Sequence, residues 1–158
     1  MRNWIIASSA VVLAGLTILF IVTAPSDEEL IRTAFEEAVQ ASRDGEPGGV
    51  LEHISRSLTF NGIPVGSRSE IADVIRRIKP DVELGSFEPV IEGDVATVVA
   101  DVRFNGSFLT YTVDETIHGV QIKLAKEPGT RWLLLPGHRW RISEITMPDL
   151  ASVQSFAQ

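Results

Sequence analysis

The longest uninterrupted run of apolar residues lies near the amino terminus. Residues 4–24, WIIASSAVVLAGLTILFIVTA, contain no charged side chain, and acidic residues begin at Asp27. At about 1.5 Å of rise per residue, a helix of this length crosses a hydrocarbon core about 30 Å thick. The pattern therefore predicts a transmembrane helix over residues 4–24, preceded by a short cytoplasmic segment, residues 1–3.

The charges that flank this span predict its orientation. Arg2 precedes the span, and an acidic run begins at Asp27. Because Lys and Arg are retained on the cytoplasmic side, we expect residues 25–158 to lie outside the cell membrane. The alternative is a cleaved signal peptide, which would leave the domain secreted. The apolar stretch is longer than the core of a usual signal peptide. The possible cleavage site after Ala24 is followed by Pro25, which generally hinders cleavage. A retained single-pass anchor is therefore favoured.

After the span, apolar residues recur at helical spacing in three segments. Capping boxes at residues 26–29 and 67–70 open the first and third helices, because in each a serine hydroxyl and a glutamate carboxylate can cap the first turn. We expect the first helix to end near Gly45 and Pro80 to end the third. The apolar positions of the three helices are Leu30, Ile31, Ala34, Phe35, Ala38 and Ala41; Val50, Leu51 and Ile54; and Ile71, Val74, Ile75 and Ile78.

After Pro80 the apolar positions alternate with period two, which is typical of strands with one buried face. Pro89 interrupts the first of these strands and indicates an edge or a bulge. The predicted strands cover residues 82–92, 95–104, 117–126 and 139–147, with a strand or loop over 108–116, and the predicted turns lie at Gly93-Asp94, Asn105-Gly106, residues 127–130 and Pro136-Gly137.

Three helices followed by antiparallel strands predict an α+β fold. In such a fold the helices pack on one face of a curved, mainly antiparallel sheet. The part of the 158-residue chain that follows residue 24 is long enough for one domain with its own core and too short for two. We therefore assign residues 26–147 to one domain and residues 148–158 to a weakly patterned carboxy-terminal tail.

Four segments carry a resemblance to a known family: SDEELIRTAFEEAVQA, SRSEIADVIRRI, VIEGDVATVVADVRF and HRWRISEI. Together they resemble the nuclear transport factor 2-like superfamily, also called the SnoaL-like or cystatin-like α+β group, over residues 26–147. The resemblance implies a cone-shaped α+β barrel in which the helices and the concave sheet face enclose an apolar cavity open at one end. It also implies several functions, namely small-ligand binding, isomerisation or hydrolysis, and a purely structural role, because this fold does not select one.

The composition and the motifs exclude several kinds of site and partner. The chain has no cysteine, so disulfides, thiolate catalysis and thiolate metal sites are excluded. The chain has 14 basic and 21 acidic residues, and Arg2 precedes the span. The exported part therefore has 13 basic and 21 acidic residues, a formal charge of 13 − 21 = −8. Because this charge repels phosphate, nucleic acid is not expected as a partner. Three histidines without metal-ligand spacing, and the absence of a GxSxG or phosphate-binding glycine motif, lead us to expect neither a metal nor a cofactor.

Four polar residues are candidates for lining a ligand pocket, and no residue is assigned a catalytic role. His118 has the strand parity of Val120, so its side chain is expected to point toward the core or the cavity, where a neutral imidazole can act as a base or a donor. The alternative is a histidine at the rim, hydrogen-bonded or in water. The other three candidates are Glu144, His53 and Tyr111.

Glu144 shares its parity with Trp140, whereas Ile145 has the other parity, so either a bulge shifts this strand or both of its faces are partly buried. An inward Glu144 would have a pKa raised by desolvation and would be an acid candidate. His53 lies on the flank of the short second helix, which borders the cavity mouth in the superfamily, or it is simply solvated there. Tyr111 is the single tyrosine, but no position matches the tyrosine and acid of steroid-isomerising relatives.

Strand residues that alternate with the inward-facing ones are expected on the outer face of the sheet. Asp101 and Arg103 are expected there as a cross-strand charge pattern rather than a catalytic pair. Val99 and Ile117 are expected on the same face, which makes it mildly apolar and compatible with a modest homodimer interface.

We therefore expect a membrane-anchored, extracytoplasmic binding or scaffold domain without catalysis. Its expected partners are the membrane through residues 4–24, a small apolar ligand, and either a second copy through the sheet face or a protein of a membrane complex. The role would be similar to that of the membrane-anchored domain of this fold in type IV secretion machines. The alternative is a small-molecule enzyme of the SnoaL or ketosteroid-isomerase kind that uses an inward acid or His118.

Overall fold

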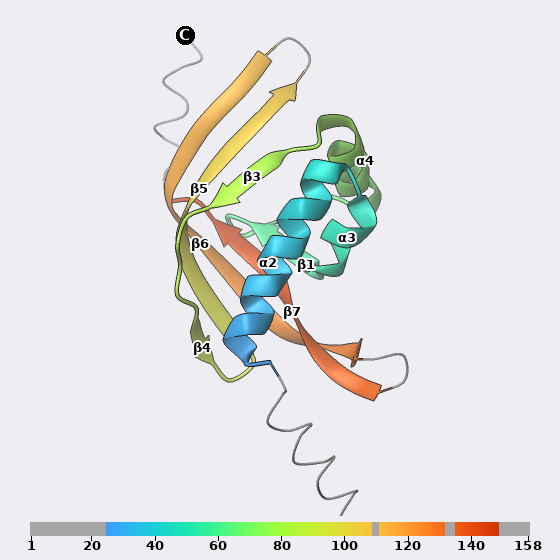
Figure 1. The fold of residues 1–158 in the computed structure, drawn as a ribbon, viewed down its shortest axis with the longest axis vertical. Helices are drawn as coiled ribbons and strands as arrows, with labels where there is room; N and C mark the ends of the chain where they lie inside the picture. Colours follow the sequence, from blue (N-terminus) through green and yellow to red (C-terminus); the bar gives the residue numbers. More distant parts are fainter. Residues whose placement is uncertain (1–24, 109–110, 132–134, 149–158) are drawn as a thin grey trace, which may run out of the picture.

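The computed structural model describes residues 25–108, 111–131 and 135–148. The predicted transmembrane segment, residues 4–24, lies outside the described residues, as does the tail after Pro148. No helix in the described part is long and apolar enough to cross a membrane. The described residues form an α+β fold with a curved sheet and three helices on one of its sides (Figure 1).

Helices α2 and α4 begin and end where local sequence signals predict. Helix α2 (Asp27–Asp44) and helix α4 (Arg68–Ile78) both start with a complete capping box. Gly45, with φ of 72°, ends α2 in the left-handed conformation that glycine adopts without steric cost. Helix α3 (Pro47–Glu52) is shorter than predicted, because Ile54 already belongs to the first strand.

The sheet has seven strands in the order β2-β1-β7-β6-β5-β3, and β4 pairs separately with β5. All pairs are antiparallel except β1 with β7. The mainly antiparallel α+β arrangement that the sequence predicts is therefore confirmed. The strands are β1 (Ile54–Phe60), β2 (Ile63–Pro64), β3 (Asp81–Leu84), β4 (Val90–Glu92), β5 (Val95–Phe108), β6 (Tyr111–Arg131) and β7 (Leu135–Thr146).

Three predicted turns are wrong because long hairpins continue through them. Asn105 and Gly106 lie inside β5 and pair with β6, and residues 127–130 lie inside β6 opposite Pro136 and Gly137 of β7. Ladder hydrogen bonds outweigh the local turn preference of these residues. Gly129 instead lets the side chain of Arg139 pack against the backbone of β6, because a Cβ at this position would lie only 2.8 Å from Cγ of Arg139. The predicted turn at Gly93-Asp94 is confirmed.

Strand β1 was not predicted, because its pairing partner is distant in sequence. It runs parallel to β7, with Ile54 opposite Ile142 and Thr59 opposite Glu144. Its alternation is weak, since Ser55 and Leu58 are its buried residues. Pairing with β7, and not local periodicity, makes this segment a strand.

Two β-bulges reverse the side-chain parity of the sheet. Ala100 pairs with Val120 but Val102 pairs with Ile117, so β6 contains one extra residue, and Gly119 adopts a positive φ of 67° there. Beyond this bulge Ile117 packs against the core, which corrects its predicted place on the outer face. A second bulge lies in β7, where Lys123 pairs with Glu144 and Leu124 with Ile142.

The main core lies between α2 and the concave face of the sheet. Two side chains of α2, Ile31 and Phe35, pack against the central strands, so the space between this helix and the sheet is filled. A smaller cluster of Ala41, Val50 and Ile75 joins the three helices. The buried members of the main core on the strands are Ala96, Val98, Ala100, Val120, Ile122, Leu124 and Trp140.

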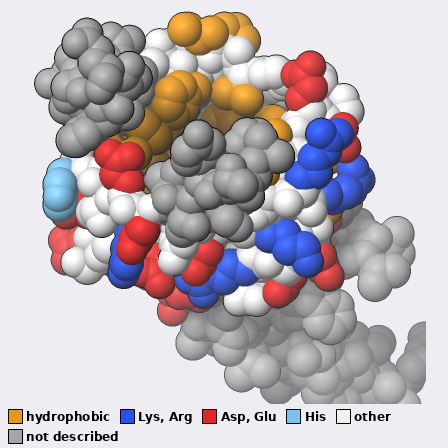
Figure 2. Space-filling view, turned by 90° about the horizontal axis from the view of Figure 1, so that it is seen from above, with side chains coloured by type: hydrophobic (Ala, Val, Ile, Leu, Met, Phe, Trp, Pro, Cys, Tyr) orange, Lys and Arg blue, Asp and Glu red, His pale blue; other side chains and the backbone are white. Residues whose placement is uncertain are grey.

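The two ends of the domain differ. The first turn of α2, strand β4 and the described end of the β6–β7 hairpin lie at one end, which we name the proximal end (Figure 1). Helix α4 and the described end of the β5–β6 hairpin lie at the other, distal end. Figure 2 looks onto the distal end and shows hydrophobic side chains gathered in a hollow there. The family resemblance implies an apolar cavity between the helices and the concave sheet face, but Ile31 and Phe35 fill this space beneath α2.

Candidate functional site

Two grooves follow helix α2, one on each of its flanks. The α2–β3 groove has a volume of about 410 Å³, and the α2–β7 groove has a volume of about 370 Å³. Both volumes lie in the range of small-molecule sites, roughly 300–1,000 Å³. The α2–β3 groove is lined by Arg32, Phe35, Glu36, Val39, Arg43, Val82, Glu83, Leu84 and Phe87, and the α2–β7 groove by Leu30, Thr33, Ala34, Glu37, Glu52, His53, His138, Arg139 and Trp140.

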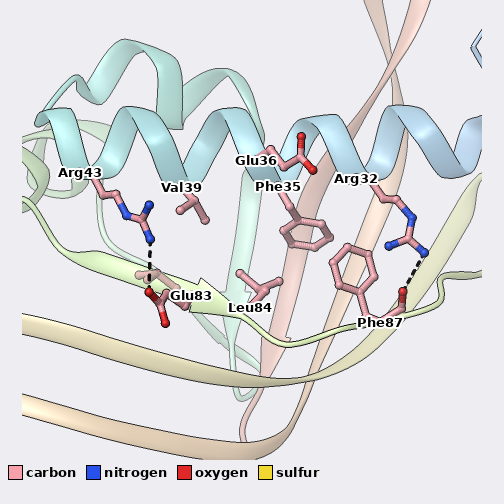
Figure 3. A pocket seen from close by; sticks show the side chains of 9 residues that line it. Arg32, Phe35, Glu36, Val39, Arg43, Glu83, Leu84 and Phe87 are labelled. Carbon is pink, nitrogen blue, oxygen red and sulfur yellow. Dashed lines mark hydrogen bonds and ion pairs between the residues drawn. The ribbon is translucent and has the colours of Figure 1, made fainter.

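The floor of the α2–β3 groove is apolar and aromatic (Figure 3). The rings of Phe35 and Phe87 meet edge to face, with centroids 5.2 Å apart and planes inclined by 69°. Val39 and Leu84 point into the same space from α2 and β3. This groove therefore presents a hydrophobic surface with an aromatic corner, formed where the segment after β3 runs beside the first half of α2 (Figure 3).

Two arginines of α2 lie at the rim of this groove, and both are engaged by the protein. Arg32 donates to the backbone carbonyl of Phe87, with Nη2···O 2.9 Å, and its Cζ lies 5.0 Å from the centroid of that ring. Arg43 forms ion pairs with Asp81 and Glu83 of β3. These contacts hold β3 and the segment after it against α2. The apolar floor is then the part of the groove that can contact a ligand.

The α2–β7 groove contains a histidine with a perturbed pKa. His53 follows α3, and its side chain is 12% exposed, with Nε2 3.1 Å from Oε2 of Glu37. Burial lowers the pKa of His53, with Arg139 acting in the same direction, and this outweighs the opposite effect of Glu37 and Glu52. A neutral imidazole that donates its Nε2–H to Glu37 fits this geometry.

The lowered pKa of His53 predicts an acid-side loss of stability. Between its lowered folded value and the ordinary value of 6.5, the unfolded chain binds more protons than the folded chain, so falling pH favours unfolding. We expect the free energy of unfolding to decrease as the pH falls below about 6.5, and to decrease less in His53→Gln, which keeps an N–H donor. Urea unfolding across this pH range, monitored by pulse proteolysis, compares the two slopes. Equal slopes would contradict a buried neutral His53.

A second polar centre joins the start of α2 to the sheet. The indole Nε1–H of Trp140 donates to Oδ1 of Asp27 at 3.0 Å, and the ammonium of Lys126 donates to Oδ2 at 3.0 Å. Burial raises the pKa of Asp27, but these two hydrogen bonds outweigh burial and hold the pKa below its usual value. In the sequence Asp27 indicates only a favourable charge at a helix start, because neither partner is near it along the chain.

The structure separates the four candidate residues of the sequence. His118 is wrong as an inward residue, because the bulge at Gly119 turns it outward, where its side chain is 77% exposed and its Nδ1 lies 2.9 Å from Oδ2 of Asp101. Glu144 is also on the outer face, paired with Lys123 at 2.8 Å. Tyr111 begins β6, and its side chain lies outside the described part of the structure.

His53 is thus the candidate that lines a described groove, with Glu37 as its partner. The outer-face placement of Asp101 and Arg103 is confirmed, and Arg103 pairs with Asp114 at 2.8 Å. Among the described residues, no group of three or more histidine, aspartate or glutamate side chains is arranged to hold a metal ion.

The sequence predictions missed the α2–β3 groove. Arg32, Arg43 and Phe87 have no shared sequence signal, since they are brought together only when β3 packs along α2. Charged residues on the exposed flank of an amphipathic helix normally indicate solvent contact. Their pairing with β3 and with the segment after it could not be read from helical periodicity.

Comparison with known proteins identifies the fold. No protein-family model matches the chain, and no curated protein is similar to it in sequence. An NTF2-like protein from Cytophaga hutchinsonii superposes with a TM-score of 0.59 at 13% identity, covering 77% of this chain and 97% of that chain. An NTF2-like protein with a cystatin-like fold from Novosphingobium aromaticivorans gives 0.55 at 17% identity, covering 93% and 95%.

The CaMKII hub of S. rosetta is similar in structure as well, with a TM-score of 0.58 at 10% identity, covering 78% of this chain and 97% of that chain. Identities this low carry information about the fold and none about activity. The described domain therefore has the nuclear transport factor 2-like, or cystatin-like, α+β fold that the sequence resemblance implies.

Proposed function

We propose that this chain is a membrane-anchored, extracytoplasmic binding domain that holds a small, mainly apolar ligand in the α2–β3 groove without catalysing a reaction. The observation that carries the proposal is the groove itself, which lies between α2 and β3, has a volume of about 410 Å³ and has an apolar floor. The uncharged span of residues 4–24 supports the membrane location.

The chemistry of the groove supports binding rather than catalysis. Phe35, Val39 and Leu84 supply apolar contacts, while Arg43 at the rim already pairs with acids of β3. A ligand with an elongated apolar body would remove this floor from water and gain affinity from the area buried. It would not need to break the ion pairs at the rim.

The alternative, a small-molecule enzyme, is supported by one feature of the α2–β7 groove. The paired His53 and Glu37 resemble in form a general base held by a carboxylate. Against this alternative, the residues that it would use if they faced inward, Glu144 and His118, both lie on the outer face of the sheet. We therefore favour binding.

Filling the groove tests the proposal. In Val39→Phe the larger side chain would occupy the space between α2 and β3, and we expect photocrosslinking of a diazirine-labelled fatty acid to α2 and residues 82–87 to weaken about tenfold in apparent affinity, equivalent to about 1.4 kcal/mol. The full chain in lipid nanodiscs is used, and mass spectrometry maps the crosslinked peptides, so that probe dissolved in lipid does not contribute.

The matched control is Val99→Phe, the same substitution at a side chain that is exposed on the outer face of β5. It should leave crosslinking in the groove unchanged. Crosslinks that never map to the groove, or that are equally strong in Val39→Phe and the parent chain, would overturn the proposed site.

A further inference from the structure

The β4–β5 hairpin is unusually apolar for an exposed segment. Val90, Ile91 and Val95 are 62%, 37% and 46% exposed. They are three of the six large apolar side chains that are exposed in the described part of the chain, although the hairpin is only a small fraction of it. Ile91 pairs with the buried Ala96 and so belongs to the inner face, whereas Val90 and Val95 lie on the outer face of the hairpin. Scattered exposed apolar residues are ordinary, but two neighbouring ones on one face of a hairpin indicate a contact surface.

Contacts of one lysine place this hairpin beside the start of α2. The backbone N–H of Lys126 donates to the carbonyl of Asp94, in the turn of the hairpin, at 2.8 Å. The ammonium of the same residue donates to Asp27, the first residue of α2, at 3.0 Å. The hairpin turn and the helix start therefore lie about one lysine side chain apart, both at the proximal end of the domain (Figure 1).

The tether between the apolar span and this end is short. Only Pro25 and Ser26 separate residue 24 from α2, and two extended residues reach at most about 7 Å. A span embedded in a bilayer would therefore hold Asp27 at the membrane surface. Because the hairpin turn lies about one lysine side chain from Asp27, it would be held near the same surface.

We propose that the β4–β5 hairpin rests against the lipid surface through Val90 and Val95, which share its outer face. This inference rests on the proposed function, because it needs the retained anchor. Contact with the interfacial region removes these two side chains from water. Glu92 and Asp94 on the same hairpin provide no attraction to anionic lipid, so the contact is apolar and persists in zwitterionic lipid and at high salt.

Site-specific fluorescence quenching tests this contact. Since the chain has no cysteine, single variants Val90→Cys, Val95→Cys, Val99→Cys and Val74→Cys each carry one bimane label. The full chain is placed in phosphatidylcholine vesicles that contain lipids with a nitroxide near the headgroup. We expect several-fold stronger quenching at positions 90 and 95 than at position 74 on α4, which lies at the distal end.

Position 99 provides a graded control. It lies on the same strand face as position 95 but four residues further along β5, about 13 Å at 3.3 Å per residue, so its quenching should be intermediate or absent. Adding phosphatidylglycerol or salt should not strengthen quenching at position 95. Equal quenching at positions 95 and 74 would overturn the inference, as would quenching at position 95 that appears only with anionic lipid.

Two further measurements separate the remaining explanations. Flotation with the vesicles after alkaline carbonate washing reports the anchor, so a chain that fails to float contradicts the proposed function, whereas a floating chain without quenching at position 95 contradicts only this inference. Pyrene attached at position 95 reports self-association. Excimer emission without lipid quenching would assign the hairpin to an interface between copies and overturn the lipid contact.

Discussion

Replacing Phe35 by alanine is expected to lower the free energy of unfolding by about 3–5 kcal/mol. Phe35 is buried in the core between α2 and the sheet, and its ring also packs edge to face on Phe87. The truncation would remove this packing and leave a cavity between the helix and the strands, because a close-packed interior relaxes only in part. Pulse proteolysis of the full chain in urea measures the change.

The control for this substitution is Val74→Ala on α4. The side chain of Val74 is half exposed, and its truncation should change the free energy of unfolding by less than about 0.5 kcal/mol. A loss at Phe35 no larger than the loss at Val74 would contradict the assignment of Phe35 to the main core. Because Phe35 also forms the floor of the α2–β3 groove, a folded Phe35→Ala chain should bind the fatty-acid probe more weakly.

The second large effect is expected at Asp27. In Asp27→Ala the indole N–H of Trp140, whose side chain belongs to a residue only 2% exposed, loses its acceptor, and a buried donor without a partner costs about 1–3 kcal/mol. Lys126 loses its anion in the same change. The expected result is a decrease in the free energy of unfolding of that size, measured by pulse proteolysis in urea.

A double-mutant cycle isolates this hydrogen bond. Trp140→Phe removes the N–H but keeps an aromatic ring, so Asp27→Ala should cost about 1 kcal/mol less in that background. The lowered pKa of Asp27 sets the pH window, because the deprotonated form is favoured in the folded state. The contribution of the Asp27 carboxylate to the free energy of unfolding is fully present above pH 3.8, the ordinary pKa of an aspartate. It is lost as the pH falls through the lowered pKa of Asp27 in the folded state. Additive effects of the two substitutions would contradict a direct interaction.

Asp27 also connects the two proposals. It starts α2, whose flanks form both grooves, and through Lys126 it holds the β4–β5 hairpin at the proximal end. A change at Asp27 should therefore affect the position of the hairpin relative to the bilayer, whereas Val39 acts only on the groove. The two properties can be separated by these substitutions.

The helices could be predicted because their signals are local. The serine and glutamate of each capping box lie three residues apart, and Gly45 ends α2 through its own backbone conformation. Of the candidate residues whose side chains are described, His53 lines a groove, the α2–β7 groove, whereas none of them lines the α2–β3 groove. His118 and Glu144 both lie on the outer face because of bulges, His118 within the bulge of β6 and Glu144 next to the bulge of β7. The sequence offered a bulge as one alternative for Glu144, but alternation along one strand could not decide between the alternatives.

The sequence by itself therefore determined the α+β class, the three helices, the caps of α2 and α4, and the mainly antiparallel order of the later strands, because short-range periodicity and capping encode these features. Only the tertiary structure decided that Ile117 faces inward and His118 outward, that Phe87 meets Arg32 across a groove, and that the β4–β5 hairpin lies beside the start of α2. The physical reason is that strand register, bulges and helix docking depend on pairing between residues far apart in the chain, and no local pattern records which partner each residue meets.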